Sequence, residues 1–165
     1  MCRIASVATV TLVSIALYTT GAGAQAPEPV EGRHRPFDQL LDLNVRDGLV
    51  YYRAVKSERG RLDRYVASLN VPSAAYDKWP RDEKVAFWLN AYNAIVLQTA
   101  VNHYPIRGKS ADYPASSIRQ IPGAFERAKH RIAGRAVTLD EIEKTILPEF
   151  KDPRVYLALG RGAVG

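Results

Sequence analysis

Residues with catalytic or metal-binding chemistry are few in this sequence. Cys2 is the only cysteine, and it lies in an N-terminal segment that we expect to be removed. No thiol is then left for a disulfide, a metal site or a nucleophile. There are three histidines, His34, His103 and His130. The HExxH, CxxC, GxSxG and P-loop patterns are missing, which excludes the enzyme classes that those motifs define. We therefore expect neither a bound metal nor a cofactor.

Long apolar runs are also scarce, and the only candidate lies at the N-terminus. Arg3 precedes the apolar run Ile4 to Tyr18, and the small residues Gly21 to Ala24 follow it. This order is typical of a secretory signal peptide, here residues 1–24. No other uninterrupted run approaches the roughly 20 apolar residues that span a bilayer. We expect an exported protein, periplasmic or extracellular, without stable membrane insertion after cleavage. An uncleaved N-terminal anchor is the alternative.

Acidic residues are outnumbered, because 17 of them face 23 lysines and arginines, and the formal net charge is +6. A basic protein can meet nucleic acid or an anionic surface. Here the basic residues are scattered, and the densest clusters, Arg33 to Arg35 and Arg127 to Arg135, are short and interrupted. We therefore expect a basic surface without a nucleic-acid partner.

The segment Trp79 to Pro105 predicts one long helix around which a single domain is built. Pro80 and Asp82 favour a helix start, and Pro105 marks the end of the helix. The helix is apolar almost all round, which is typical of a helix buried on several sides. Its large apolar residues are Phe87, Trp88, Leu89, Tyr92, Ile95, Val96, Leu97 and Val101.

Two shorter helices are expected before this central helix. Residues 25–35 are rich in proline and read as a flexible leader, so the domain is expected to span 36–165. An amphipathic helix is predicted from Pro36 to the Asp47-Gly48 turn, and another over Arg61 to Leu69.

After the central helix, residues 106–122 predict a long loop, and such loops often carry function. A hairpin is expected over 129–137, and a capping box at Thr138 to Glu141 precedes a helix through Leu147. Apolar residues alternate with other residues over Arg154 to Leu159, as is typical of a half-buried strand. The fold class is therefore α+β and mainly helical, with a long buried central helix, a small hairpin and a further C-terminal strand. The chain stops after that strand, so we expect a domain incomplete at its C-terminal end.

Catalytic candidates are limited to His103 and Glu143. His103 lies in the last turn of the central helix, where a C-terminal cap competes with a role as general base. Glu143 belongs to an acidic first turn that the helix dipole also explains. His34 is expected to be solvated in the leader, and His130 to face solvent.

The amides Asn90 and Asn93 lie three residues apart on the apolar helix, where an unpartnered amide is costly. They either fix helix packing or line a site. Arg154 opens the expected strand and is predicted to pair inward with Glu143. Exposed aromatic rings could form a groove for sugar or peptide, although core packing is the competing interpretation. The aromatic set is Tyr51, Tyr52, Trp79, Trp88, Tyr92 and Tyr104.

Several ordered segments resemble the domain of unknown function 547 family over roughly Phe37 to Gly165. The most specific is KVAFWLNAYNA at Lys84 to Ala94. The others are Tyr104-Pro105, Ala133 to Arg135 with Thr138 to Glu143, and Asp152 to Val155 running into Ala158-Leu159.

The resemblance implies a mostly helical α+β domain of exported bacterial proteins and some multidomain eukaryotic ones, without a settled activity. It also implies that many members carry a histidine and a cysteine where this chain has Tyr156 and Arg161. Thiol chemistry is therefore not expected here. We take Asn90, Asn93 and Arg154 of the matching segments as ligand-binding candidates, together with Tyr156 and Arg161, which stand at the two departures from the family pattern. The family pattern continues past Gly165.

Together these observations predict an exported protein that acts as a binding or scaffold domain for an unknown ligand or protein of the cell envelope. The alternative enzyme is a hydrolase or transferase that acts on an envelope polymer or peptide through carboxylates and His103. A third alternative is a truncated family member without independent function.

Overall fold

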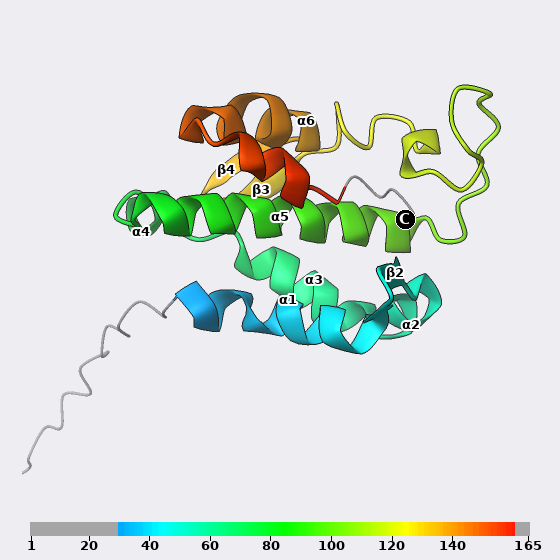
Figure 1. Ribbon diagram of the computed structural model, residues 1–165, viewed down its shortest axis with the longest axis horizontal. Helices are drawn as coiled ribbons and strands as arrows, with labels where there is room; N and C mark the ends of the chain where they lie inside the picture. The colour runs from blue at the N-terminus through cyan, green and yellow to red at the C-terminus, as the bar shows by residue number, and fades with distance from the viewer. Residues whose placement is uncertain (1–29, 161–165) are drawn as a thin grey trace, which may run out of the picture.

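The structure, a computed structural model, describes residues 30–160, so the expected signal peptide and Arg161 lie outside the described residues. One long helix runs through the middle of the molecule with other elements on both sides (Figure 1). The α-helices are α1 (Val30–Asn44), α2 (Tyr52–Ser57), α3 (Arg59–Ser68), α4 (Ser73–Tyr76), α5 (Arg81–Asn102) and α6 (Leu139–Glu141). The predicted class, mainly helical α+β, is confirmed.

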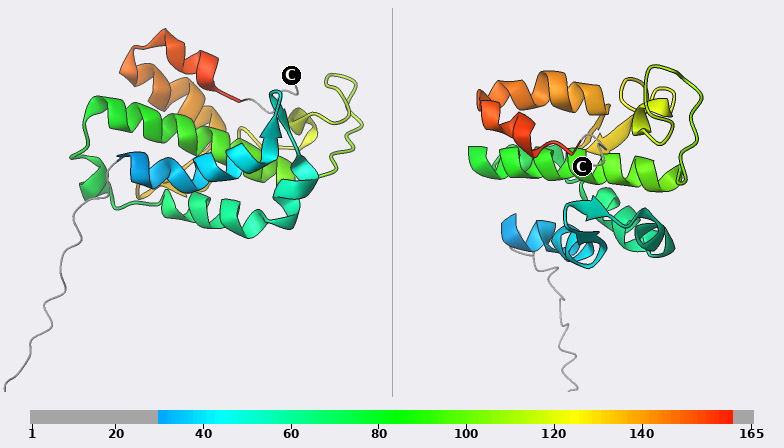
Figure 2. Two further views of the ribbon diagram at one scale, coloured as in Figure 1. Left: turned by 60° about the horizontal axis from the view of Figure 1, so that its bottom comes forward. Right: turned by 45° about the vertical axis from the view of Figure 1, so that its right-hand side comes forward.

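Helix α5 is the predicted central helix. It begins after Pro80, carries Asp82 and Glu83 in its first turn, and ends at His103. Residues all along the helix are buried, among them Phe87, Trp88, Tyr92 and Ile95, which are fully enclosed. Helices α1 to α3 cover one side of α5, and the C-terminal elements cover the other (Figure 2). The helix is therefore the core that both layers share.

The N-terminal layer starts earlier than the sequence indicates. Helix α1 begins at Val30 and contains Pro36, so the predicted flexible leader is wrong for residues 30–35. The reason is tertiary contact, because Arg33 approaches Glu83 at 3.6 Å and His34 bonds Tyr65 at 2.7 Å. Such contacts stabilise the first turns of a helix beyond its intrinsic propensity.

A tight hairpin follows α1 and confirms the predicted Asp47-Gly48 turn. Strands β1 (Val45–Arg46) and β2 (Leu49–Val50) pair antiparallel. Asp47 and Gly48 both have positive φ, 53° and 76°. Two consecutive positive φ angles are what a two-residue turn between twisted strands requires.

The C-terminal layer begins with the long loop 103–129, in which the 3₁₀ turn η1 (Ile118–Gln120) places Ile118 in the core. The predicted hairpin is confirmed as β3 (His130–Ile132) and β4 (Arg135–Val137). The predicted capping box is also confirmed, because Thr138 N donates to the Glu141 carboxylate at 2.7 Å and Glu141 N donates to Thr138 Oγ1 at 3.1 Å.

After α6 the chain continues in helical turns of changing type. The π-helical turn η2 (Ile142–Ile146) leads into the 3₁₀ turn η3 (Leu147–Phe150). Pro148 lies in the first turn of η3, a position that lacks an internal partner for N–H, so the proline continues the helical path where we expected it to stop.

The predicted C-terminal strand is wrong, because residues Pro153–Ala158 form the 3₁₀ helix η4. The Asp152 carboxylate accepts from Arg154 N at 3.1 Å and Pro153 follows it, which starts a helical turn. Val155 and Leu159 are buried whereas Leu157 is 89% exposed, so the apolar residues have helical spacing rather than one strand face. Within residues 30–160, no helix combines the length and apolar character needed to cross a bilayer.

Candidate functional site

The two catalytic candidates lie apart. His103 ends α5, and its Nδ1 lies 2.9 Å from the carbonyl oxygen of Thr99. Glu143 lies on η2 and accepts a 2.7 Å hydrogen bond from the Tyr92 hydroxyl. Because Tyr92 and His103 are separated by about 16 Å of helix at 1.5 Å per residue, His103 and Glu143 do not form an acid/base pair. The contact of His103 with Thr99 is that of a helix cap.

Asn93 connects α5 to the C-terminal segment. Its Nδ2 donates to the carbonyl oxygen of Ala158 at 2.9 Å, and its Oδ1 accepts from Gly160 N at 2.7 Å. Both ends of the amide are therefore used to hold the main chain after η4. Asn90 instead donates to Ala86 O at 3.0 Å within its own helix and lies half-buried at the edge of a cleft.

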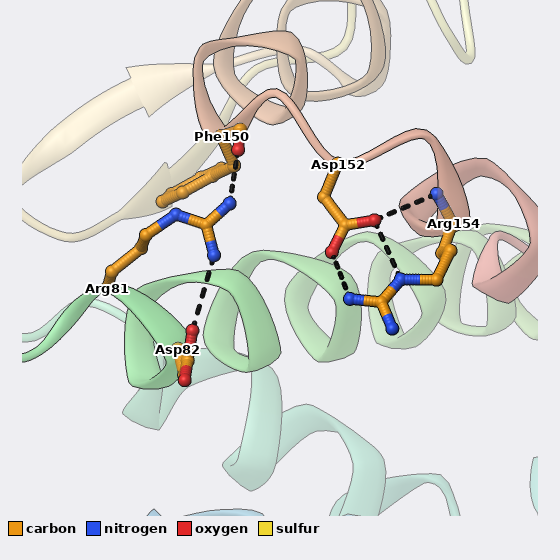
Figure 3. A network of polar contacts seen from close by, with 5 residues as sticks. All are labelled: Arg81, Asp82, Phe150, Asp152 and Arg154. Atoms are coloured by element: carbon orange, nitrogen blue, oxygen red, sulfur yellow. Dashed lines mark hydrogen bonds and ion pairs between the residues drawn. The ribbon is translucent and has the colours of Figure 1, made fainter.

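Arg154 is exposed and bonds Asp152, so the predicted pairing with Glu143 is wrong (Figure 3). Its Nε and Nη2 atoms donate to the two carboxylate oxygens of Asp152 at 2.9 and 2.7 Å. These hydrogen bonds lower the pKa of Asp152 to about 2. The close-up also shows Arg81, which pairs with Asp82 at 3.3 Å and donates to the carbonyl of Phe150. Arg81 and Arg154 at this end of α5 are therefore each paired with a carboxylate.

Tyr156 lies on η4 and is 39% exposed. Arg161, the remaining ligand-binding candidate, lies outside the described residues.

The aromatic set divides between core and surface. Trp88 and Tyr92 are fully buried, as core packing predicts. Trp79 is half-buried and faces the Arg33 guanidinium at 4.0 Å. Near the C-terminal end of α5, Tyr51 is exposed, and Tyr52 and Tyr104 are half-buried. These three rings are the part of the set that can meet a ligand.

Tyr52 and Tyr104 stack on one another, with ring centroids 5.9 Å apart and planes inclined by 20°. A small cavity of about 160 Å³ and a larger one of about 640 Å³ both border this ring pair. We call the ring pair and its two cavities the tyrosine groove. The small cavity is completed by Ala100, Pro105, Ile106, Ser116 and Ile118. The larger one is completed by Val50, Tyr51, Arg53, Ala54 and Ser57.

Three separate segments build the tyrosine groove. Helix α2 and the β1–β2 hairpin lie beside the C-terminal end of α5, where the long loop leaves the helix (Figure 1). Lys56 of α2 donates to the carbonyl oxygen of Tyr104, which joins α2 to the start of the loop. Burial raises the pKa of Tyr52, so its phenol stays protonated at neutral pH. The loop over 106–122 contributes Ile106, Ser116 and Ile118 to the small cavity, and its role in a site stays a prediction.

A second cleft, of about 690 Å³, lies between α1 and α5 and was not expected from the sequence. His34 borders it, with its Nδ1 2.7 Å from the Tyr65 hydroxyl, so the expected solvated histidine is wrong. Burial, assisted by the neighbouring Arg33 charge, lowers the pKa of His34 to about 4 and keeps the ring neutral. The signal that was missed is the spacing of His34, Phe37 and Leu41, which puts all three on one helix face. The cleft is lined by Gly32, His34, Arg35, Phe37, Asp38, Leu41 and Asn90.

Burial also lowers the pKa of His130, which is half-buried at the start of β3 instead of facing solvent. Among residues 30–160, no three His, Cys, Asp or Glu side chains gather as ligands for a metal ion.

Comparison with known proteins gives a family and no activity. Searches of curated proteins and of solved structures found no match. A family model described as "protein of unknown function, DUF547" matches residues 76–165. The match contains α5 and the C-terminal layer and starts later than the resemblance near Phe37 suggests. Because it covers more than half of the chain, the protein belongs to the DUF547 family.

Proposed function

We propose that this protein is an exported binding domain of the cell envelope and that the tyrosine groove is its ligand site. The observation that carries the proposal is the stacked pair Tyr52 and Tyr104, which is half-buried at the edge of the core and borders two cavities. Tyrosine offers a large apolar face and a polar hydroxyl, and it is enriched where proteins meet their ligands. The N-terminal segment, which has the order of a signal peptide, supports export.

A binding role is preferred over a hydrolase or transferase because the named catalytic residues are separated. His103 caps α5 and Glu143 bonds Tyr92 on another part of the helix. A general acid and base need to reach one substrate bond from hydrogen-bond distance. His103 and Glu143 therefore do not support the enzyme alternative as an acid/base pair.

Cosedimentation with isolated bacterial envelopes tests the proposed function. We expect the purified protein to sediment with envelopes, and Tyr51→Ala to reduce the bound fraction severalfold. Tyr51 is 55% exposed, so its removal leaves the core intact. Tyr113→Ala is the matched control, because this tyrosine is 44% exposed on the long loop and does not line the groove.

Equal sedimentation of the wild type and both variants would remove the groove from the proposal. Export is tested separately by fractionating cells that express the full chain. Recovery of the protein in the cytoplasm alone would contradict an envelope role.

A further inference from the structure

We propose that the tyrosine groove binds an acidic, proline-containing peptide segment in an extended conformation. This inference rests on the proposed function, since it takes the groove as the ligand site, and it adds the chemical class of the ligand. Three features of the groove carry it: the arrangement of the tyrosines, the character of the small cavity, and the charges on the two segments beside it.

The tyrosines form an aromatic-lined surface rather than a single exposed ring. Tyr52 and Tyr104 lie nearly parallel, and Tyr51 borders the larger cavity beside them. Aromatic-lined grooves of this kind dock proline-rich peptides in the polyproline II conformation. Such peptides lose little conformational entropy on binding because they are already extended in solution.

The small cavity is sized for one apolar side chain or proline ring. Its volume of about 160 Å³ corresponds to roughly five water molecules at 30 Å³ each. Besides the two rings, its walls are Ala100, Pro105, Ile106 and Ile118, with Ser116 as the additional polar residue. A sugar ring would bring several hydroxyls into this cavity and leave most of them without partners, which is costly. The lining therefore favours a peptide over a glycan.

Arg53 is the charged side chain that lines the groove. The two neighbouring segments carry further cations, and each segment is followed directly by a carboxylate, Glu58 or Asp112. Residues 50–57 contain Arg53 and Lys56, and residues 104–111 contain Arg107 and Lys109. Arg53, Arg107 and Lys109 are exposed and form no ion pair with any residue in the range 30–160. Lys56 donates to the carbonyl oxygen of Tyr104. An acidic ligand complements this charge, and a basic one is repelled.

The test measures binding of a fluorescent decapeptide of alternating proline and glutamate to the purified protein. Two peptides separate the features of the ligand: one replaces each glutamate by glutamine, and the other replaces each proline by glycine. We expect each replacement to weaken binding at least fivefold. Tyr51→Ala should weaken binding of the Pro-Glu peptide about tenfold, and Arg53→Gln about threefold, with the thermal midpoint of unfolding unchanged. The matched controls Tyr113→Ala and Arg131→Gln should bind as the wild type does.

Polygalacturonate, an anionic glycan, separates failure of the inference from failure of the proposed function. If polygalacturonate binds with the same Tyr51 dependence and the Pro-Glu peptide does not bind, the peptide inference is overturned while the groove remains the ligand site. If Tyr51→Ala and Tyr113→Ala bind every probe as the wild type does, both proposals fail. Equal affinity for the glutamate and glutamine peptides would also overturn the inference.

Discussion

The two ends of α5 differ in what gathers there, ion pairs at the N-terminal end and stacked tyrosines at the C-terminal end. At the N-terminal end, Arg154 is held by the Asp152 carboxylate and Arg81 by Asp82 and the carbonyl of Phe150. At the C-terminal end, Arg53 lines the larger cavity beside the stacked tyrosines, is exposed and forms no ion pair among the described residues. A charged side chain that forms an ion pair within the chain needs no ligand to account for it. Exposed cations without an ion pair, such as Lys78 and Lys151, occur at the N-terminal end as well. What supports the proposed ligand site is that Arg53 lies in the lining of an aromatic groove, where it is available to an acidic ligand.

Protonation of His34 on α1 has the largest expected effect on the free energy of unfolding. Its pKa is lowered to about 4 in the folded chain, from 6.5 in the unfolded one, so the folded state prefers the neutral ring. The neutral ring therefore makes its full contribution to the free energy of unfolding above pH 6.5. This contribution falls by about 2 kcal/mol, after allowance for partial exposure, as the pH falls toward 4. Urea unfolding at pH 7 and at pH 4.5 measures this loss.

The variants His34→Gln and His130→Gln separate the two histidines, because the pKa of His130 is also lowered by burial. We expect His34→Gln to remove most of the pH dependence in this window and His130→Gln to remove less. An unchanged pH dependence in His34→Gln would show that the ring is not buried against Tyr65.

Asn93→Ala tests the connection between α5 and the C-terminal segment. The variant loses two hydrogen bonds, to Ala158 O and from Gly160 N, and we expect a loss of about 1–2 kcal/mol in unfolding free energy. Asn102→Ala is a suitable control because this asparagine lies exposed in the last turn of the same helix. If both variants lose equally little, the amide does not hold the C-terminal segment.

The double variant Arg107→Gln and Lys109→Gln tests two exposed cations that follow Tyr104 closely in the sequence. We expect binding of the Pro-Glu peptide to weaken about fivefold, or roughly 1 kcal/mol, and unfolding free energy to stay the same. Fluorescence titration at two salt concentrations measures both the affinity and its salt dependence. Full retention of affinity would show that these cations do not meet the ligand.

Arg154→Gln gives the smallest expected effect, because exposed ion pairs contribute little. We expect no resolvable change in unfolding free energy, because water screens an exposed ion pair, and no change in peptide affinity, since Arg154 lies near Arg81 at the opposite end of α5. Weakened peptide binding in this variant would break the distinction between the two ends of the helix.

Elements with strong local signals could be predicted from the sequence. The apolar length of α5, the Thr138 capping box and the turns at Asp47-Gly48 and Ala133-Gly134 all depend on nearby residues, and all are confirmed. The segment from Pro153 to Ala158 could not be assigned this way, because its apolar residues fit both a strand and a short helix. Its helical form depends on the Asp152 cap and on contacts with distant α5.

The candidate site was predictable only in part. Surface tyrosines near the long loop were among the candidates, but their separation from the core aromatics depends on packing between α2, α5 and the loop. The partners of Arg154 and His34 are likewise set by the three-dimensional arrangement: Asp152 lies nearer than the expected Glu143, and Tyr65 meets His34 across the helices. Composition and spacing do not contain that information.

The central claim is that the ligand binds at the C-terminal end of α5. A peptide titration followed by two-dimensional NMR tests this claim most directly. We expect the Pro-Glu peptide to shift the backbone signals of Tyr51, Tyr52, Arg53 and Tyr104 in a saturable way, while those of Arg81 and Arg154 stay in place. Saturable shifts confined to the Arg81 and Arg154 end, or to the cleft beside His34, would contradict the account.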